Sequence, residues 1–244
     1  ARLVLESISN SDALYHNAEH TMMVTLVGQQ ILRGRLLTEA IQPDDWMHFM
    51  LALLVHDIGY VRGSCPGDTD TAFVIDTDGN TFTPPRGASD ASLTPWHVDR
   101  GMIYARHRFG PSARVDEERI ARAIDYTRFP VPDEPRYRQT GTEGALVRAA
   151  DLIGQMADPF YHRKINALFH EFEETGEAAK LGYANPRDLM DNYPNFFWSR
   201  IQPLIGPALE TLERTMEGKQ WIAQLYNQVF QVERRSAVLG PFPG

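Results

Sequence analysis

Apolar residues recur at helical spacing through most of the chain. Within 19–33, His20 and the apolar residues that follow it at helical intervals fall on one face of a helix. Within 44–57, an Asp-rich start leads into an almost wholly apolar run, which is typical of a helix buried on several sides. We expect Gly59 to end this helix. Further helical patterning covers 97–109, 116–126, 141–157 and several segments between 160 and 235.

The pattern changes between residues 60 and 95. This stretch is rich in Gly, Pro, Asp and Thr, and its apolar alternation at 72–75 is followed by an Asp78-Gly79 step. Together these features predict a small β-hairpin carried on a long insertion. Such an insertion is either a lid over a functional site or plain surface decoration. The Gly- and Pro-rich tail, 240–244, is not expected to be helical.

Composition narrows the class of protein. The chain has 244 residues, a formal net charge of −8 and a single cysteine, Cys65. It therefore has no internal disulfide and no cysteine-based metal cage. The absence of a Lys/Arg-rich run argues against a long nucleic acid as partner. The longest apolar stretch, 49–55, is too short to span a bilayer, so no membrane role is expected, and the cytoplasm is the expected location.

Three short motifs place ionisable residues on or beside apolar helical faces. They are Tyr15-His16-Asn17-Ala18-Glu19-His20, then His56-Asp57-Ile58-Gly59, then Ala149-Ala150-Asp151-Leu152. Burying such groups costs free energy unless they are paired or coordinated. Imidazoles and carboxylates that converge on one divalent cation would remove this cost. Neighbours on a helix normally diverge, but at a helix end Gly59 would let the chain turn so that both side chains of the His-Asp pair face one ion.

The ordered set His20, His56-Asp57 and Asp151 resembles the H…HD…D motif of the HD-domain superfamily of metal-dependent phosphohydrolases. The resemblance covers about residues 12–157 and implies an all-α, HD-domain-like helical bundle. It implies that these four residues are ligands of a divalent metal ion: Mn, Mg, Zn, Co or Fe. The sequence then predicts a single domain over 1–244, in which the insertion, about 60–95, follows the HD motif and helices at about 158–236 follow the motif-bearing core.

The segment from Tyr15 to His20 also resembles the Tyr-His-Asn-x-x-His element of cyclic-nucleotide phosphodiesterases. In that branch the histidine of the triplet is the general acid, which implies this role for His16. Because His16 and His20 project from one helical face, His16 can reach the leaving group of a substrate while His20 holds the ion. An alternative for His16 is a simple hydrogen bond near a helix start. The branch also has a further histidine shortly after the His-Asp pair, which this chain lacks.

A second metal site is uncertain. Two-metal members of the superfamily carry two further histidines before the last aspartate, and His97 resembles the first of them. No histidine stands near Asp125, where the second is expected, so either Asp125 replaces it or the second site is absent. We therefore favour one tight metal site, with His97 binding substrate or supporting the metal ligands.

Phosphate recognition needs cations beside the metal. Arg62 and Arg100 follow the Asp57 and His97 positions closely in sequence and are candidates for substrate binding, although either can equally form a surface ion pair.

The predicted function is hydrolysis of a phosphate ester of a nucleotide or related small molecule, monoester or diester, by metal-activated water. Asp57 or Asp151 would accept a hydrogen bond from that water, and His16 would protonate the leaving group. One alternative is a di-iron oxygenase of the same superfamily, and another is a non-catalytic, nucleotide-binding regulatory module. The sequence leaves a homo-oligomer possible.

Overall fold

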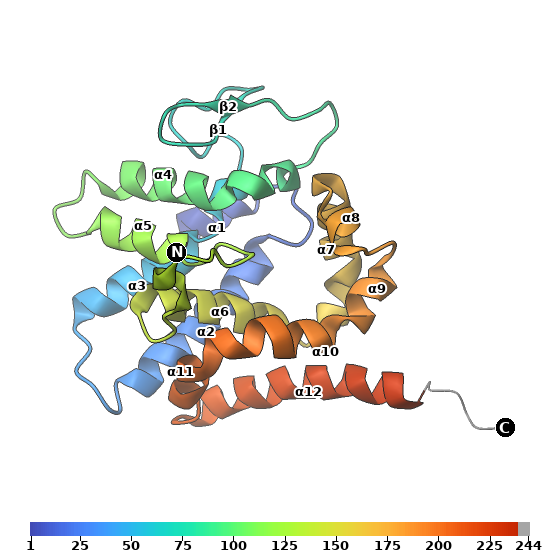
Figure 1. Ribbon diagram of the computed structural model, residues 1–244. Helices are drawn as coiled ribbons and strands as arrows, with labels where there is room; N and C mark the ends of the chain where they lie inside the picture. Colours follow the sequence, from blue (N-terminus) through green and yellow to red (C-terminus); the bar gives the residue numbers. More distant parts are fainter. Residues whose placement is uncertain (239–244) are drawn as a thin grey trace.

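The computed structural model describes residues 1–238 and is mainly helical, which confirms the all-α prediction (Figure 1). The six-residue tail for which no helix was predicted lies outside the described residues. The helices are α1 (Arg2–Ile8), α2 (Ala18–Arg35), α3 (Pro43–Val55), α4 (His97–Phe109), α5 (Glu117–Asp125), α6 (Glu143–Met156), α7 (Tyr161–Thr175), α8 (Glu177–Leu181), α9 (Pro186–Asp191), α10 (Tyr193–Phe196), α11 (Gln202–Leu212) and α12 (Met216–Val238). Short 3₁₀ turns η1 (Ile58–Tyr60), η2 (Asp90–Trp96) and η3 (Pro135–Arg138), and a π-helical turn η4 (Phe197–Ile201), complete the helical elements.

Helices α2 and α6 pack against each other near the centre of the molecule (Figure 1). His20 and Val24 on the predicted face of α2 are buried, together with the later apolar residues of that face. Gly154 of α6 allows the two helices to approach closely, because a Cβ atom there would lie 3.1 Å from the Val24 backbone. This close contact lies about one helical turn from His20 on α2 and from Asp151 on α6.

Helix α3 ends at Val55, earlier than the sequence pattern predicts, and the chain continues into η1. Gly59 is not in a left-handed conformation, so its expected role as a helix-ending turn residue is wrong. Its physical role is close packing, because a Cβ atom at Gly59 would lie 1.9 Å from the carbonyl oxygen of His97. Because Gly59 has no side chain, the start of α4 can pack directly against the turn that follows α3.

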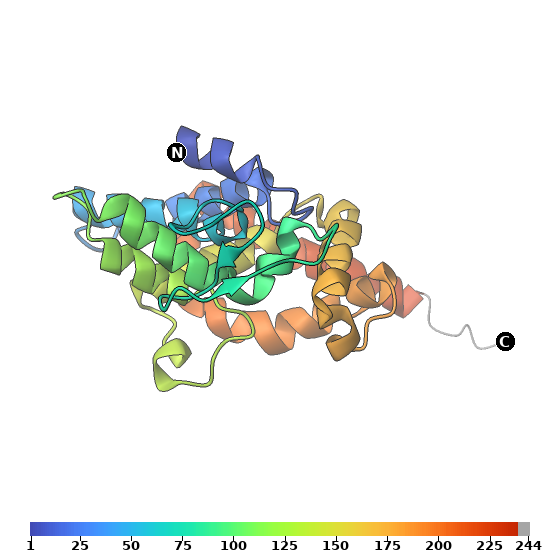
Figure 2. The ribbon, with the colours of Figure 1, turned by 90° about the horizontal axis from the view of Figure 1, so that it is seen from above.

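The predicted hairpin is present. Strand β1 (Phe73–Val74) pairs antiparallel with β2 (Thr81–Phe82), and Gly79 has a φ of 82° in the connecting turn. The insertion that carries the hairpin lies along α4, on the opposite side of the molecule from α12 (Figure 1), and the view from above shows the same insertion crossing over α4 (Figure 2). The 3₁₀ turn η2 leads from the insertion into α4.

Helices α11 and α12 pack against α2 and α6, and α7 packs against η2, α8 and α9. In the described part of the chain, none of the helices combines the length and apolar character needed to cross a bilayer. Helix α1 was not predicted from the sequence.

Candidate metal centre

The four predicted metal ligands come from three segments of the chain: helix α2, the turn after α3, and helix α6. His20 lies in the first turn of α2, whose start is fixed by the Asn17 side chain accepting hydrogen bonds from the backbone N–H groups of Glu19 and His20. His56 and Asp57 follow the last residue of α3, and Asp151 lies within α6. The fold therefore brings together residues that the sequence separates widely.

The ligand atoms converge closely. One ligand atom each from His20, His56 and Asp151 lie within 4.8 Å of one another. The Nε2 atom of His20 is 3.1 Å from Asp151 Oδ1 and 3.5 Å from Asp57 Oδ2. The Nε2 atom of His56 is 3.1 Å from Asp57 Oδ2 and 3.7 Å from Asp151 Oδ1. The ligand atoms of His20, His56 and Asp151 are thus close enough together that they could hold one metal ion.

The donor atoms of this cluster fit a cation. The His56 Nδ1–H group donates to the Leu53 carbonyl oxygen at 2.8 Å, which leaves Nε2 facing the cluster, where it can bind an ion once its proton is lost. Among the described residues, neither His56 Nε2 nor Asp57 Oδ2 has a hydrogen-bond partner, although both atoms are buried. Leaving such groups unsatisfied costs about 1–3 kcal/mol each, and coordination of a divalent ion would remove the cost. Two imidazoles and two carboxylates form a donor set that Zn, Mn, Co and Fe accept.

Electrostatics in the cluster favour positive charge. Burial acts to lower the pKa of His56, but the carboxylates of Asp57 and Asp151 outweigh it and raise the pKa to about 9. Burial acts to raise the pKa of Asp57, and the surrounding imidazoles, His56 foremost, lower it well below the usual range instead. Without a metal, His56 therefore keeps a proton at neutral pH, at the place where a divalent cation would bind.

His16 lies beside this cluster and is held by a carboxylate that sequence reasoning missed. Glu171 of α7 accepts a hydrogen bond from His16 Nδ1 at 2.6 Å and from the Tyr15 backbone N–H group at 2.6 Å. Burial acts to lower the pKa of His16, but Glu171 raises it to about 9. The sequence offered only the spacing of Glu171 from Leu168, one helical turn, which places it on an apolar helical face but does not identify His16 as its partner. The carboxylate that holds His16 thus lies beyond residue 157, where the predicted motif-bearing core ends.

Tyr60 is packed between two histidines. Its ring stacks on His16 with a centroid distance of 4.6 Å and on His97 with a centroid distance of 4.6 Å. The His97 Nδ1–H group donates to the Thr94 carbonyl oxygen at 2.6 Å, so Nε2 of His97 is free to accept a hydrogen bond. Burial lowers the pKa of His97, which keeps this acceptor available. The Tyr60 ring therefore separates His97 from His16, and His97 is not among the residues whose ligand atoms converge.

The two arginines expected to bind phosphate are engaged elsewhere. Each guanidinium nitrogen of Arg100 donates to a protein oxygen, and the side chain is fully buried. These contacts contradict a substrate-binding role for Arg100. Arg62 is partly exposed, with its Nε 2.8 Å from Asp90 Oδ1 and one terminal nitrogen donating to the Ala88 carbonyl oxygen at 2.6 Å. Substrate binding by Arg62 stays a prediction, in competition with these contacts.

Asp125 does not replace the missing histidine. Its carboxylate accepts hydrogen bonds from Arg128 Nε and from the Tyr137 hydroxyl, each at 2.8 Å, and lies 3.0 Å from Arg136. A carboxylate surrounded by two guanidinium groups is already neutralised. The idea that Asp125 is a ligand of a second metal is therefore wrong, which leaves one metal site as the arrangement that these side chains favour.

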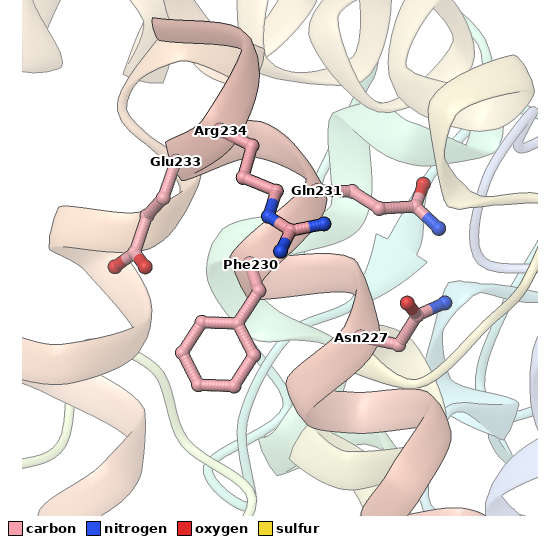
Figure 3. A pocket seen from close by; sticks show the side chains of 5 residues that line it. All are labelled: Asn227, Phe230, Gln231, Glu233 and Arg234. Carbon is pink, nitrogen blue, oxygen red and sulfur yellow. The ribbon is translucent and has the colours of Figure 1, made fainter. Parts of the chain in front are cut away.

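Two hollows lie on helix α12. One, of about 550 Å³, is lined by Asn227, Phe230, Gln231, Glu233 and Arg234 (Figure 3). The other, of about 240 Å³, is lined in part by Tyr161, His162 and Gln228. None of the predicted site residues lines either hollow, so the buried charged cluster, and not the shape of the surface, identifies the candidate site.

Comparison with known proteins gives a family but no activity. The family model described as Npun_R2479-like matches residues 1–235, so the chain belongs to the Npun_R2479-like family. No curated protein is significantly similar to the chain.

Proposed function

We propose that this member of the Npun_R2479-like family is a metal-dependent phosphohydrolase of the HD-domain type. The observation that carries the proposal is the buried cluster of His20, His56, Asp57 and Asp151, in which His56 Nε2 and Asp57 Oδ2 lie 3.1 Å apart and neither atom has a hydrogen-bond partner among the described residues. The same four residues form the H…HD…D pattern in the sequence. The four residues come from different parts of the sequence, and only the tertiary fold brings them together. This convergence supports the proposal.

His20, His56, Asp57 and Asp151 would hold the ion. When bound, a divalent ion in such a site activates water and neutralises charge on phosphoryl oxygens. Asp57 or Asp151 would orient the attacking water by accepting a hydrogen bond from it.

His16 would act as the general acid. Glu171 keeps the imidazole protonated at neutral pH and fixes its Nδ1 atom, so Nε2 is the nitrogen left to protonate a departing oxygen. Tyr60 restrains the plane of the ring by stacking. These two contacts orient a protonated imidazole, as a general acid for hydrolysis requires.

The proposed substrate is a small phosphate ester, a monoester or diester of a nucleotide or related molecule. This part of the proposal rests on the resemblance to HD-domain phosphohydrolases. His97, with its free Nε2 atom near the cluster, is the side chain best placed to contact such a substrate. Location in the cytoplasm belongs to the same proposal.

The di-iron oxygenase is the less favoured alternative. It requires ligands for a second iron, and the carboxylate nearest in sequence to the missing ligand, Asp125, is neutralised by Arg128 and Arg136. Two irons per purified chain would reverse this preference.

Elemental analysis of the purified protein tests the proposal. We expect about one divalent transition metal per chain in the wild type and almost none in Asp57→Asn, because the substitution removes a charged ligand. The metal-loaded protein should then release phosphate from at least one member of a panel of nucleotide mono- and diesters. A wild-type protein that takes up no Mn, Zn, Co or Fe on dialysis would refute the proposal, and a loaded protein that binds nucleotides tightly without product would favour the regulatory module.

A further inference from the structure

A buried ion pair joins the insertion to helix α4. The side chains of Asp68, in the insertion, and Arg100, in α4, are 1% and 0% exposed. Arg100 donates to Asp68 through both terminal nitrogens, at 3.1 Å to Oδ1 and 2.9 Å to Oδ2. Asp68 also accepts hydrogen bonds from the backbone N–H groups of Cys65 and Val74. The carboxylate therefore organises the loop before strand β1 and, at the same time, holds the arginine in a fixed, two-pronged geometry.

The same arginine holds the turn that carries two predicted metal ligands. Arg100 Nε donates to the Gly59 carbonyl oxygen at 2.6 Å, and a terminal nitrogen donates to the Val61 carbonyl oxygen at 3.0 Å. Gly59 follows Asp57 closely in sequence, so these bonds fix the path of the chain directly after the His56-Asp57 pair.

Close backbone packing transmits this geometry to the turn. A Cβ atom on Gly101 would lie 3.3 Å from the His56 carbonyl oxygen, and one on Gly59 would overlap the His97 carbonyl oxygen. Backbones in such contact cannot shift independently, because the interior has no free space into which they can relax. The position of Arg100 therefore sets both the start of α4, where His97 lies, and the turn that bears His56 and Asp57.

The later part of the insertion is also fixed. The Ser89 backbone N–H group and hydroxyl donate to Glu174 of α7 at 2.6 and 2.5 Å, and the Asp90 N–H group donates to Asp12 at 2.6 Å. Glu174 lies one turn beyond Glu171 on α7. A segment attached at both ends to the elements that form the site does not have the freedom of a lid.

We propose that the insertion is a fixed support for the metal-binding turn, and that Asp68 is a positioning residue that acts through Arg100. This inference rests on the proposed function, because the turn that it positions is the one proposed to bind the ion. Asp68 touches neither the ion nor the substrate. Its effect is to hold the Arg100 guanidinium where it can bind the Gly59 and Val61 carbonyl oxygens.

The test compares Asp68→Asn with Asp125→Asn, a substitution of another buried, arginine-paired aspartate outside the cluster. In the metal-free proteins, hydrogen exchange is measured at the amides of Tyr60 and Val61, which donate within the turn. In the cobalt-loaded proteins, the visible absorption band and the Kd for Co²⁺ are measured. For Asp68→Asn we expect exchange to accelerate locally, the band to change, and the Kd to rise about tenfold or more, as for other residues that orient metal ligands.

The outcomes distinguish the positioning role of Asp68 from the proposed metal-dependent function. Asp125→Asn should lose stability without changing the cobalt band or the exchange of the turn relative to the rest of the protein. If Asp68→Asn behaves in the same way as this control, the positioning role is refuted. If the turn loosens in Asp68→Asn but the wild type binds no metal, the support stands and the proposed function fails. Should Asp68→Asn not fold, Asp68→Glu, which keeps the charge on a longer side chain, gives the same comparison.

Discussion

Two buried clusters of charged residues differ in how their charges are satisfied. Around Asp125, the guanidinium groups of Arg128 and Arg136 and the Tyr137 hydroxyl supply donors to one carboxylate. Around Asp57 and Asp151, two carboxylates face two imidazoles, and buried polar atoms stay without hydrogen bonds among the described residues. The first cluster is complete within the protein, whereas the second leaves the buried His56 Nε2 and Asp57 Oδ2 atoms without hydrogen-bond partners among the described residues. A buried group of ionisable residues indicates a metal site only when the protein does not itself neutralise it.

The largest expected difference between the clusters is metal retention. His56→Ala and Asp57→Asn should each weaken metal binding by more than the roughly 10- to 100-fold typical for a residue that only supports a ligand. Asp125→Asn should keep the metal but lose about 1–3 kcal/mol of stability, because the buried Tyr137 hydroxyl and Arg128 lose a charged acceptor. Arg128 still keeps Asp99, and Arg136 keeps Glu134, as counter-charges. Elemental analysis and denaturant unfolding measure these effects. Loss of metal from Asp125→Asn at a temperature where it is folded would contradict the distinction.

The second prediction concerns the imidazole beside the cluster. His16→Gln should lower the rate of phosphate release about 10²- to 10⁴-fold, the range for loss of a general acid, while the metal content stays unchanged. Glu171→Gln should give a smaller loss, because the imidazole remains but is less firmly held. Steady-state kinetics on metal-loaded protein measure both. His170→Gln, a substitution of an exposed histidine on the same helix as Glu171, is the control and should be close to wild type.

The pH dependence of the activity gives a further test of His16 as the general acid. His16 has a pKa raised to about 9 in the metal-free protein, so its acid form is present at neutral pH and activity should fall as the pH rises through the alkaline range. A bound cation repels the imidazolium and moves this fall below pH 9. In Glu171→Gln the fall should shift further, toward the ordinary pKa of about 6.5. A pH profile that is the same in both proteins would remove His16 from the role of acid.

The ion pair of His16 and Glu171 also makes stability depend on pH. Because the folded-state pKa of His16 is raised, the stabilisation is fully present below about pH 6.5 and is lost as the pH rises through about 9. Unfolding of the metal-free wild type should therefore become easier over this window, and Glu171→Gln should show less of the effect. Urea unfolding at several pH values measures the difference.

The smallest expected effect is thermal stabilisation by metal. At a free metal concentration about 100 times the Kd, binding adds about 2.7 kcal/mol of stability, which corresponds to a Tm increase of roughly 5–10 °C for a chain of this size. Asp125→Asn should show the same increase from a lower starting Tm, and Asp57→Asn should show almost none. Thermal scans with and without a chelator separate these cases. An equal increase in Asp57→Asn would mean that the ion binds elsewhere.

Local structure was predictable from the sequence wherever one element buries one face. The buried stripe that begins at His20, the apolar helix α3 and the hairpin around Gly79 follow from spacing and turn chemistry, and the structure has them. The end of α3 did not follow from the sequence in the same way. Gly59 packs closely against α4 and does not adopt the left-handed conformation that the sequence pattern predicts.

The sequence by itself determined the all-α class, since periodicity is a local property, and its resemblance to the H…HD…D motif implied which ionisable residues meet in the candidate site. Tertiary structure alone decided which charges are neutralised by other parts of the chain. Arg100 has the right chemistry to bind phosphate, but it is paired with Asp68. Asp125 has the right chemistry to bind a metal, but it is paired with Arg128. Glu171 became a partner of His16 only through the packing of α7. Electrostatic energy depends on distance and burial, and a linear sequence contains neither until the chain has folded.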